Sequence, residues 1–390
     1  MKILIVTVHF APAWIEGGVT RALWNSARAL ALAGAQVQVV TTSAYLEAAD
    51  QVPPTREEAG LSIRTLPVLA ALGSSAHRSA LAPGLVPTLW KACRDADLCL
   101  MQGLWTLPVA VASTVCRRQR VPYVLWAHGG LEEISLAEKS GKKKLYLSLF
   151  LSRVIQRSAA VCFTSEAELR NSESALGERP GIVHSHGFDP IEQRRRQPEN
   201  LRAELGLAAD CSILGLSGRI HPRKGFDVIL RALANCSERV HLVSFGPDLE
   251  GYLREVLALA DKLGLGDRFH VLGYLEDEKL WSTYASIDLL VVPSYGESFS
   301  NAVIEALAQG TEVMLSDKVA LADYVKAKRL GRVVEGHDHR DWSEAIERWS
   351  AEAGDFDRER AAKIVATDFD LEESGRKLLS DFDRLLAGTS

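Results

Sequence analysis

The chain has 390 residues, of which 47% are hydrophobic and 24% are charged, and its formal net charge is −5. This composition is typical of a soluble globular protein, and the length favours two domains over one core. Because basic residues are not in excess, the composition gives no indication of a nucleic-acid partner.

The cysteines and the N-terminus bear on the cellular compartment. The six cysteines show no CxxC spacing and mostly lie in or beside apolar segments, so we expect buried free thiols in a reducing cytoplasm. Residues 1–8 are apolar but are followed by His9 and Pro12, which predicts a first β-strand and no signal peptide. No apolar run reaches the roughly 18 residues of a membrane-spanning helix.

Short apolar runs alternate with helical patterns along the chain. Between the first two runs, residues 19–33 show helical spacing, and Gly34 follows as a stop. Apolar strands that alternate with helices favour parallel sheets covered on both faces. The predicted strands are residues 3–8, 36–41, 61–66, 98–102, 123–127, 160–164, 182–184, 212–217, 240–245, 269–272, 288–292 and 312–316.

Polar and charged residues interrupt this pattern between about Pro190 and Leu205, as is typical of a domain linker. We therefore predict an α/β chain of two Rossmann-like domains, residues 1–195 and 205–368, with parallel sheets facing each other across a ligand cleft. The final helix, within residues 371–390, either caps the second domain or packs back on the first.

Two loops of the first half are candidate ligand contacts. Gly17 and Gly18 follow the first predicted strand, where glycines let the backbone approach a phosphate or sugar, although a plain turn explains them as well. His128 follows the fifth strand. There it can hydrogen-bond a sugar hydroxyl or a developing charge, or simply a neighbouring carbonyl.

The second half opens with a basic loop that contains Arg219, His221, Arg223 and Lys224 and is closed by Gly225. A basic, glycine-bounded loop at the mouth of a sheet suits a diphosphate, because arginine offers a fork of donors and lysine a point charge. The alternative is a solvated basic turn. We favour Arg219 and Lys224 as ligands and expect Arg223 to face solvent.

Two further turns follow strands at the same rim, at residues 245–248 and 272–275. Gly246 and Tyr274 lie in them and are candidates for lining a nucleobase pocket, with the tyrosine ring as a stacking surface. Plain turn chemistry explains these residues equally well.

An acidic segment lies in residues 293–310, where an apolar run leads through a small-residue loop into a helix. The exposed amides of a helix N-terminus bind anions, and carboxylates such as Glu297 and Glu305 hold sugar hydroxyls. Read as two helical turns, their eight-residue spacing corresponds to roughly 12 Å of rise. That is too far to share a proton, and it suits one acid on a sugar and the other on a ribose.

Residues 138–157 combine an apolar arc with lysines and arginines on another arc. Such a basic amphipathic helix can dock on anionic lipid headgroups. An ordinary surface helix with its apolar arc in the core is the commoner explanation.

Together these residues resemble the retaining glycosyltransferases of family 4, which have the GT-B fold. The resemblance covers nearly the whole chain and implies that the final helix crosses back to the first domain. Its motifs are Gly17-Gly18, His128-Gly129, Thr164-Ser165-Glu166, Gly218-Arg219, Lys224-Gly225, Pro293-Ser294 and Glu297-x7-Glu305.

The resemblance also implies a role for each site residue. Arg219 and Lys224 would hold the donor diphosphate and help the leaving group depart, and Glu305 would bind the nucleotide ribose. Glu297 would bind hydroxyls of the transferred sugar and face its reacting carbon. His128 would contact the same sugar from the first domain.

The resemblance further implies that the backbone amides of Phe299, Ser300 and Asn301 hold the sugar or phosphate. Such enzymes generally need no bound metal, because the basic pair and the helix dipole stabilise the leaving group. We therefore expect no cofactor and no metal beyond the nucleotide sugar itself. Many members carry glycine near the first acid, where this chain has Ser298 and Ser300. A serine hydroxyl can cap the helix there, and the sugar preference can differ.

The implied reaction moves a hexose-type sugar from a UDP- or GDP-linked donor to an acceptor hydroxyl with retention, in surface polysaccharide or glycolipid synthesis. The alternatives are a GT-B sugar phosphorylase, a nucleotide-sugar epimerase, and a catalytically silent sugar- or lipid-binding scaffold. A glycan or lipid-linked acceptor is expected, with residues 44–56 and 69–86 selecting it. We expect a cytoplasmic protein, at the inner membrane face if residues 138–157 bind lipid.

Overall fold

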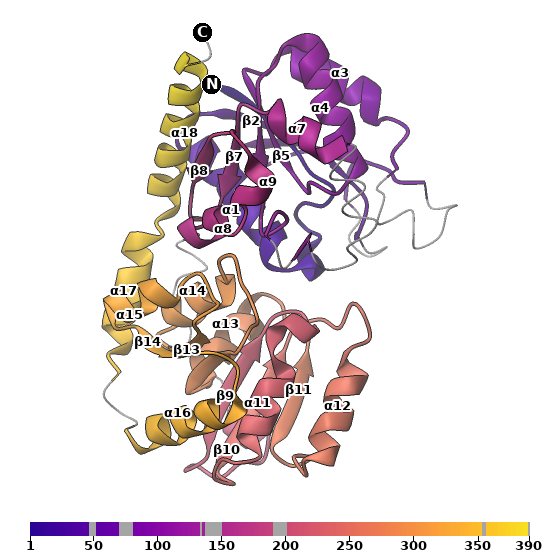
Figure 1. The fold of residues 1–390 in the computed structure, drawn as a ribbon. Coiled ribbons are helices and arrows are strands. Elements are labelled where there is room, and N and C mark those ends of the chain that lie inside the picture. The colour runs from indigo at the N-terminus through magenta and orange to yellow at the C-terminus, as the bar shows by residue number, and fades with distance from the viewer. Residues whose placement is uncertain are drawn as a thin grey trace. The chain divides into compact units, whose positions relative to one another are not determined.

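The computed structural model describes residues 1–46, 52–69, 81–132, 135–136, 150–189, 201–352 and 356–388. The chain divides into two compact units, which are coloured along the sequence in Figure 1. The first unit comprises Met1–Gly187 with Phe369–Ser390, and the second comprises Phe188–Asp368.

The first unit is built on an eight-stranded sheet with the order β3-β4-β2-β1-β5-β6-β7-β8. Its paired strands run parallel except β3, which is antiparallel to β4. The strands are β1 (Lys2–Val6), β2 (Gln36–Thr42), β3 (Thr55–Glu58), β4 (Leu61–Leu66), β5 (Leu98–Gln102), β6 (Tyr123–Trp126), β7 (Ala160–Phe163) and β8 (Gly181–Val183).

Helices cover both faces of this sheet, so its central strands are buried on both sides. The C-terminal helix α18 (Leu371–Gly388) packs on α1 (Gly18–Leu32), and its Leu378 and Phe382 are fully buried. The other helices are η1 (Trp14–Glu16), α3 (Leu85–Arg94), α4 (Leu107–Gln119), α7 (Ser152–Gln156), α8 (Glu166–Arg170) and α9 (Glu173–Leu176).

The second unit contains a fully parallel six-stranded sheet with the order β11-β10-β9-β12-β13-β14. Its strands are β9 (Ser212–Ser217), β10 (Val240–Phe245), β11 (Phe269–Gly273), β12 (Leu289–Val292), β13 (Glu312–Ser316) and β14 (Gly331–Val334). Its helices are α10 (Leu201–Glu204), η5 (Pro222–Lys224), α11 (Phe226–Leu233), α12 (Leu253–Lys262), α13 (Asp277–Ser286), α14 (Asn301–Ala308), α15 (Ala322–Lys328), α16 (His339–Ala351) and α17 (Arg358–Asp368).

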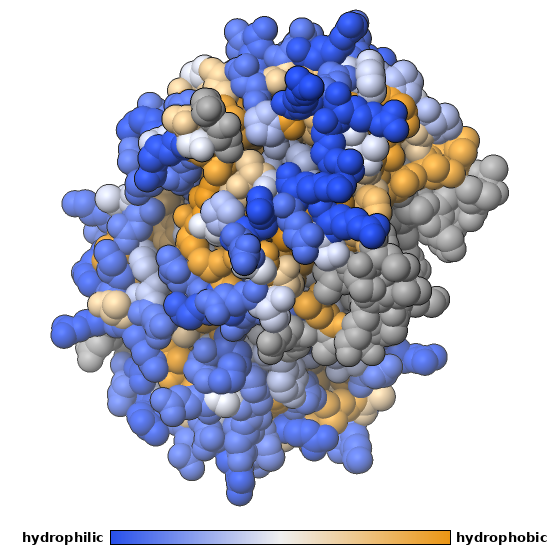
Figure 2. All heavy atoms as spheres, turned by 45° about the horizontal axis from the view of Figure 1, so that its top comes forward, coloured by the Kyte–Doolittle hydropathy of each residue, from blue (hydrophilic) through white to orange (hydrophobic). Residues whose placement is uncertain are grey.

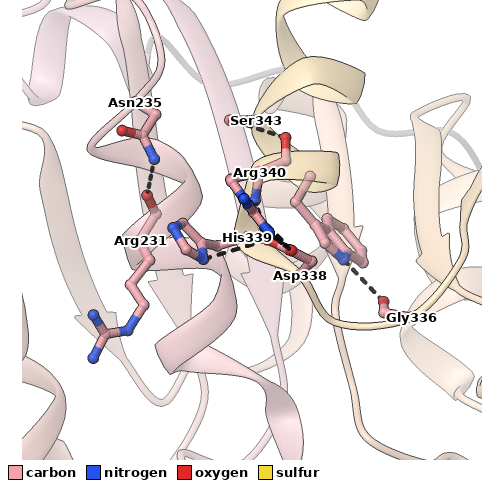
Figure 3. Close-up of polar contacts among 8 residues, drawn as sticks. Arg231, Asn235, Gly336, Asp338, His339, Arg340 and Ser343 are labelled. Carbon is pink, nitrogen blue, oxygen red and sulfur yellow. Dashed lines mark hydrogen bonds and ion pairs between the residues drawn. The ribbon is translucent and has the colours of Figure 1, made fainter.

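Side-chain capping fixes the start of α16, as Figure 3 shows. The Asp338 carboxylate accepts a hydrogen bond of 2.9 Å from the backbone N–H of Arg340, whose guanidinium binds the same carboxylate. The indole of Trp342 donates to the carbonyl of Gly336 over 3.3 Å. These contacts anchor α16 beside α11, where Trp342 is fully buried in the core.

Each predicted apolar run forms a strand within one or two residues of its predicted ends, and the helix predicted over residues 19–33 is α1. All six cysteines are unbridged, and Cys211 alone among them is not fully buried. In the described part of the chain, no helix is both long and apolar enough to cross a bilayer. Of residues 138–157, positions 138–149 lie outside the described residues, and α7 occupies most of the rest.

The face seen in Figure 2 is mostly hydrophilic, with separate hydrophobic patches. The most exposed large apolar side chains on α3 are Val86 and Trp90, at 52% and 44%. These two side chains lie one helical turn apart, and a few exposed apolar side chains are normal on a folded protein.

Candidate functional site

The candidate site of the second unit lies where its strand order reverses. β9 stands between β10 and β12 in the sheet, so the chain leaves the carboxyl ends of β9 and β12 in different directions. Open α/β sheets bind ligands at such a switch point. The predicted basic loop follows β9, and the predicted acidic segment follows β12.

The two loops are joined along their length. Gly225, with φ of 72°, lies so close to the second loop that an added Cβ would sit 2.2 Å from the carbonyl oxygen of Pro293. The N–H of Tyr295 donates to the carbonyl of Arg223 over 2.9 Å. The Arg223 guanidinium donates to the carbonyl of Gly296 over 3.3 Å, so the prediction that Arg223 only faces solvent was wrong.

Lys224 and Glu297, 73 residues apart in the chain, form an ion pair with 2.5 Å between Nζ and Oε1. The Ser294 hydroxyl donates to the same carboxylate oxygen over 3.0 Å. Burial alone would raise the pKa of Glu297, but the Lys224 ammonium, the hydrogen bonds and the Arg223 charge outweigh it and lower that pKa. Glu297 is therefore an ionised carboxylate beside a fixed cation.

Backbone hydrogen bonds hold Glu297 in a loop. Its N–H donates to the carbonyl of Lys318 over 3.2 Å, and its carbonyl accepts from the N–H of Ala320 over 3.0 Å. The helix α14 starts only at Asn301, so Glu305 lies about one turn inside it. The predicted separation by two helical turns was therefore wrong, because four of the eight intervening steps are not helical.

Glu305 is buried, with 7% of its surface exposed, and belongs to a chain of hydroxyl groups. Its Oε2 accepts a hydrogen bond of 2.7 Å from the phenol of Tyr284. The phenol oxygen lies 2.6 Å from the hydroxyl of Ser217 at the end of β9. The structure thus brings Glu297 to Lys224, and Glu305 to Tyr284.

The N-terminus of α14 contains the remaining residues predicted from the acidic segment. Phe299 and Ser300 are buried, whereas Ser298 and Asn301 are partly exposed. Ser300 is the N-cap residue, yet its φ of 80° and ψ of 83° place it in the left-handed region, and its hydroxyl makes no capping bond. The predicted capping by Ser300 was wrong, since a capping serine has an extended backbone.

Glycines bring three neighbouring strand ends close together. The N–H of Gly218 donates to the carbonyl of Phe245 over 3.0 Å, and the N–H of Gly246 donates to the carbonyl of Gly273 over 2.8 Å. A Cβ on Gly246 would lie 2.0 Å from the carbonyl oxygen of Gly218. Tyr274 follows Gly273 at this rim and is partly buried, and Arg219 follows Gly218 with an exposed side chain. A base-binding role for Tyr274 stays a prediction.

In the first unit, the predicted residues lie at the carboxyl ends of β1 and β6. Gly17 has φ of 81° at the start of α1, with nothing within 4 Å of an added Cβ, and Gly18 is exposed. His128 has φ of 44°, and its ring stacks between Trp126 and His186 at centroid distances of 5.0 and 5.2 Å. Burial, and to a lesser degree His9, lower the pKa of His128 to about 3.

A buried carboxylate, Glu168, fixes the loop that contains His128. It accepts hydrogen bonds from the N–H of Gly129 at 2.5 Å, and from the N–H and hydroxyl of Thr164, each at 2.6 Å. Burial raises the pKa of Glu168, although these bonds oppose the rise. Glu168 holds the backbone next to His128, while a role for His128, Gly17 and Gly18 in sugar binding stays a prediction.

Two residues of these networks, Tyr284 and Glu168, were not predicted from the sequence, and Ser294 was named only within the Pro293-Ser294 motif, without a role. Tyr284 lies within a helical pattern, where an aromatic residue indicates a core position. Glu168 stands three residues after Ser165, and the Ser165 hydroxyl accepts from the N–H of Glu168 as in a capping box. That spacing was the available signal. Among the described residues, no three His, Cys, Asp or Glu side chains are grouped closely enough to hold a metal ion.

Two family models match the chain. The model "Glycosyl transferases group 1" matches residues 197–365, and the model "Glycosyl transferase 4-like domain" matches residues 17–184. Between them they cover both units and both sets of loops described above. The fold and these matches define the class of protein as a GT-B glycosyltransferase.

Relatives and solved structures agree with this class. The D-inositol 3-phosphate glycosyltransferase of Nocardia farcinica is 29% identical over 92% of this chain and 83% of its own length. The protein of the same name from Mycolicibacterium smegmatis is 32% identical over 59% of this chain and 54% of its own. HepE of Anabaena, solved with UDP and glucose, is 21% identical, with a TM-score of 0.78 over 98% of this chain and 100% of its own. The chain belongs to the family 4 glycosyltransferases.

Proposed function

We propose that the protein is a retaining glycosyltransferase that moves a hexose-type sugar from a nucleoside diphosphate sugar to an acceptor hydroxyl. The observation that carries the proposal is the Lys224–Glu297 pair at the switch point of the second unit. This pair offers a cation for a diphosphate and an ionised carboxylate for sugar hydroxyls in one place. The donor is linked to UDP or GDP, and the UDP in the HepE structure favours UDP.

In the proposed reaction the donor diphosphate displaces Glu297 as the partner of Lys224. Arg219 and Lys224 then stabilise the leaving phosphate while the anomeric carbon–oxygen bond lengthens toward an oxocarbenium-like state. The leaving phosphate oxygen takes the proton of the acceptor hydroxyl. The acceptor oxygen bonds to the anomeric carbon on the face that the phosphate leaves, so the configuration is retained.

We further propose that catalysis needs no bound metal. Support comes from the cations themselves, because Arg219 and Lys224 can neutralise the charge on the leaving phosphate at the N-terminal end of α14. Activity is expected to persist in excess EDTA. Full loss in EDTA with recovery on adding Mg²⁺ or Mn²⁺ would refute the proposal.

The acceptor is proposed to be a glycan or lipid-linked glycan in the synthesis of a surface polysaccharide or glycolipid. Because two relatives are named for D-inositol 3-phosphate, that compound belongs in the acceptor panel. Contact of residues 138–157 with anionic lipid is proposed from their charge pattern. Flotation with vesicles of anionic and of neutral lipid tests it, and equal recovery with both would argue against a basic docking helix.

Replacing Lys224 by alanine tests the reaction directly. The change removes the cation proposed to stabilise the leaving phosphate, and kcat is expected to fall about a hundredfold or more. The measurement is release of nucleoside diphosphate from a panel of nucleotide sugars, with and without acceptor.

Lys326→Ala is the matched control, because Lys326 is an exposed lysine on α15 of the same unit. It is expected to keep the wild-type rate. A Lys224→Ala protein that transfers sugar at the wild-type rate would sink the diphosphate assignment. Sugar interconversion without acceptor would instead favour an epimerase.

A further inference from the structure

A chain of hydrogen-bonding groups, buried at Tyr284 and Glu305 and partly exposed at Ser217, connects three elements of the second unit. It runs from Ser217 at the end of β9, through Tyr284 on α13, to Glu305 on α14. The two contacts measure 2.6 and 2.7 Å. Tyr284 has no exposed surface, so water does not compete for its phenol group.

Chemistry fixes the direction of this chain. The phenol O–H of Tyr284 donates to Oε2 of Glu305, and a phenol has only this one proton to donate. The phenol oxygen is then the acceptor for the Ser217 hydroxyl. Hydrogen bonds that point the same way polarise one another, and this chain directs its donors toward the carboxylate.

The tyrosine ring is itself held in place. It packs edge-on against Phe245, with ring centroids 5.2 Å apart and an interplanar angle of 79°. The backbone carbonyl of Tyr284 accepts a hydrogen bond of 2.6 Å from the hydroxyl of Thr311. A fixed phenol anchors one oxygen of Glu305 and thereby sets the plane of the carboxylate.

We propose that Tyr284 is a positioning residue that orients the Glu305 carboxylate for the ribose hydroxyls of the donor. The proposal rests on the proposed function, in which Glu305 binds the ribose. A free glutamate side chain loses rotamer freedom when a ligand binds it. Here Tyr284 restricts that freedom beforehand, so the ribose hydroxyls meet a preorganised acceptor.

Tyr284→Phe removes one hydroxyl and keeps the ring. The probes are UDP, or GDP if wild type prefers it, and the corresponding 2′,3′-dideoxy nucleotide, with affinities from calorimetric titration. We expect Kd for the ribose nucleotide to rise about tenfold, the scale of a lost hydrogen bond to a charged group. Affinity for the dideoxy nucleotide should stay within twofold of wild type, and kcat at saturating donor should change little.

Ser217→Ala removes only the hydroxyl that bonds to Tyr284, and it is expected to weaken ribose nucleotide binding selectively but to a smaller extent. This variant provides the test if Tyr284→Phe folds poorly. The positioning role would be overturned if Tyr284→Phe lowered the affinity for both nucleotides equally, or lowered the affinity for neither. Glu305→Ala separates the ribose-binding role of Glu305 from the positioning role of Tyr284. If it leaves ribose discrimination intact, the ribose role of Glu305 fails and this inference with it. If it abolishes discrimination while Tyr284→Phe does not, only the inference fails.

Discussion

Ser300 combines two unfavourable features in one residue. Its backbone is left-handed, with φ of 80°, which costs a residue with a Cβ about 1–2 kcal/mol. Its hydroxyl is buried and has no hydrogen-bond partner within the described parts of the chain. Strained residues of this kind concentrate at functional sites, and Ser300 stands at the start of α14, three residues after Glu297.

Ser300→Gly is expected to raise the free energy of unfolding by about 1 kcal/mol. Glycine adopts positive φ without strain, and this gain exceeds its larger loss of backbone entropy on folding. Urea unfolding of the ligand-free protein measures the change. Ser300→Ala, which removes the hydroxyl but keeps the Cβ, should gain less. A glycine variant less stable than wild type would mean that the hydroxyl has a stabilising partner.

For single residues, the sequence indicated which side chains are candidates for the site, but it did not indicate which side chains contact one another. Lys224 and Glu297 were predicted as site residues one by one, but their contact joins loops that only the strand order brings together. The loop before Ser300 is held by backbone hydrogen bonds between Glu297 and residues 318 and 320. Local capping rules do not take such distant contacts into account, so the capping prediction for Ser300 was wrong. Tyr284 has no local signal for the positioning role proposed above, because its contacts with Ser217 and Glu305 come from other elements of the fold.

The packing of α18 on α1 depends on the absence of a side chain at one position. A Cβ on Gly375 would lie 2.0 Å from the carbonyl oxygen of Ala29, so the two helices approach to backbone contact. Leu378 and Phe382 are buried in the same cluster as Leu23 and Leu30. Any larger residue at position 375 must push the helices apart and uncover these side chains.

Gly375→Ala is therefore expected to lower the free energy of unfolding by about 1–3 kcal/mol, although alanine is the better helix former. Thermal or urea unfolding measures it. Gly388→Ala is the matched control in the same helix, because nothing lies within 4 Å of its added Cβ, and it should be neutral or slightly stabilising. A stabilised Gly375→Ala protein would show that α18 is not closely packed on α1.

The sequence predicted elements well where burial leaves a continuous apolar run. Of the strands in the described residues, two escaped prediction, β3 (Thr55–Glu58) and β14 (Gly331–Val334). β3 has the sequence Thr-Arg-Glu-Glu and is mostly exposed, so it carries no apolar pattern. β14 is short and begins with glycine and arginine at the edge of its sheet. An edge strand of this kind forms because it pairs with a neighbouring strand, and its own residues show little apolar pattern.

For the molecule as a whole, buried histidines make stability depend on pH. Burial, and to a lesser extent Lys377, lower the pKa of His184 to about 4, and burial followed by neighbouring histidines also lowers the pKa of His186. The unfolded chain therefore binds more protons than the folded one below about pH 6.5. Stability from these groups is complete above that pH and is lost on acidification toward pH 4.

We expect the free energy of unfolding to fall by about 2 kcal/mol between pH 7 and pH 5 for His184 alone. Urea midpoints across this range measure the loss. His184→Gln should flatten the profile, whereas His339→Gln, at a side chain that is 40% exposed, should leave it nearly unchanged. A wild-type profile that is flat from pH 7 to pH 5 would contradict the neutral, buried state of His184.

The return of α18 to the first unit also sets the order in which the newborn protein can mature. All of Phe188–Asp368 must leave the ribosome before α18 appears. Because α1 ends at Leu32 and α18 begins at Leu371, the apolar face of α1 stays uncovered for roughly 17 to 70 seconds at about 5–20 residues per second. A chain ended early by a premature stop never hides that face and stays a target for chaperones and proteases. Completion of the first unit therefore depends on translation through α18, after the whole second unit has been made.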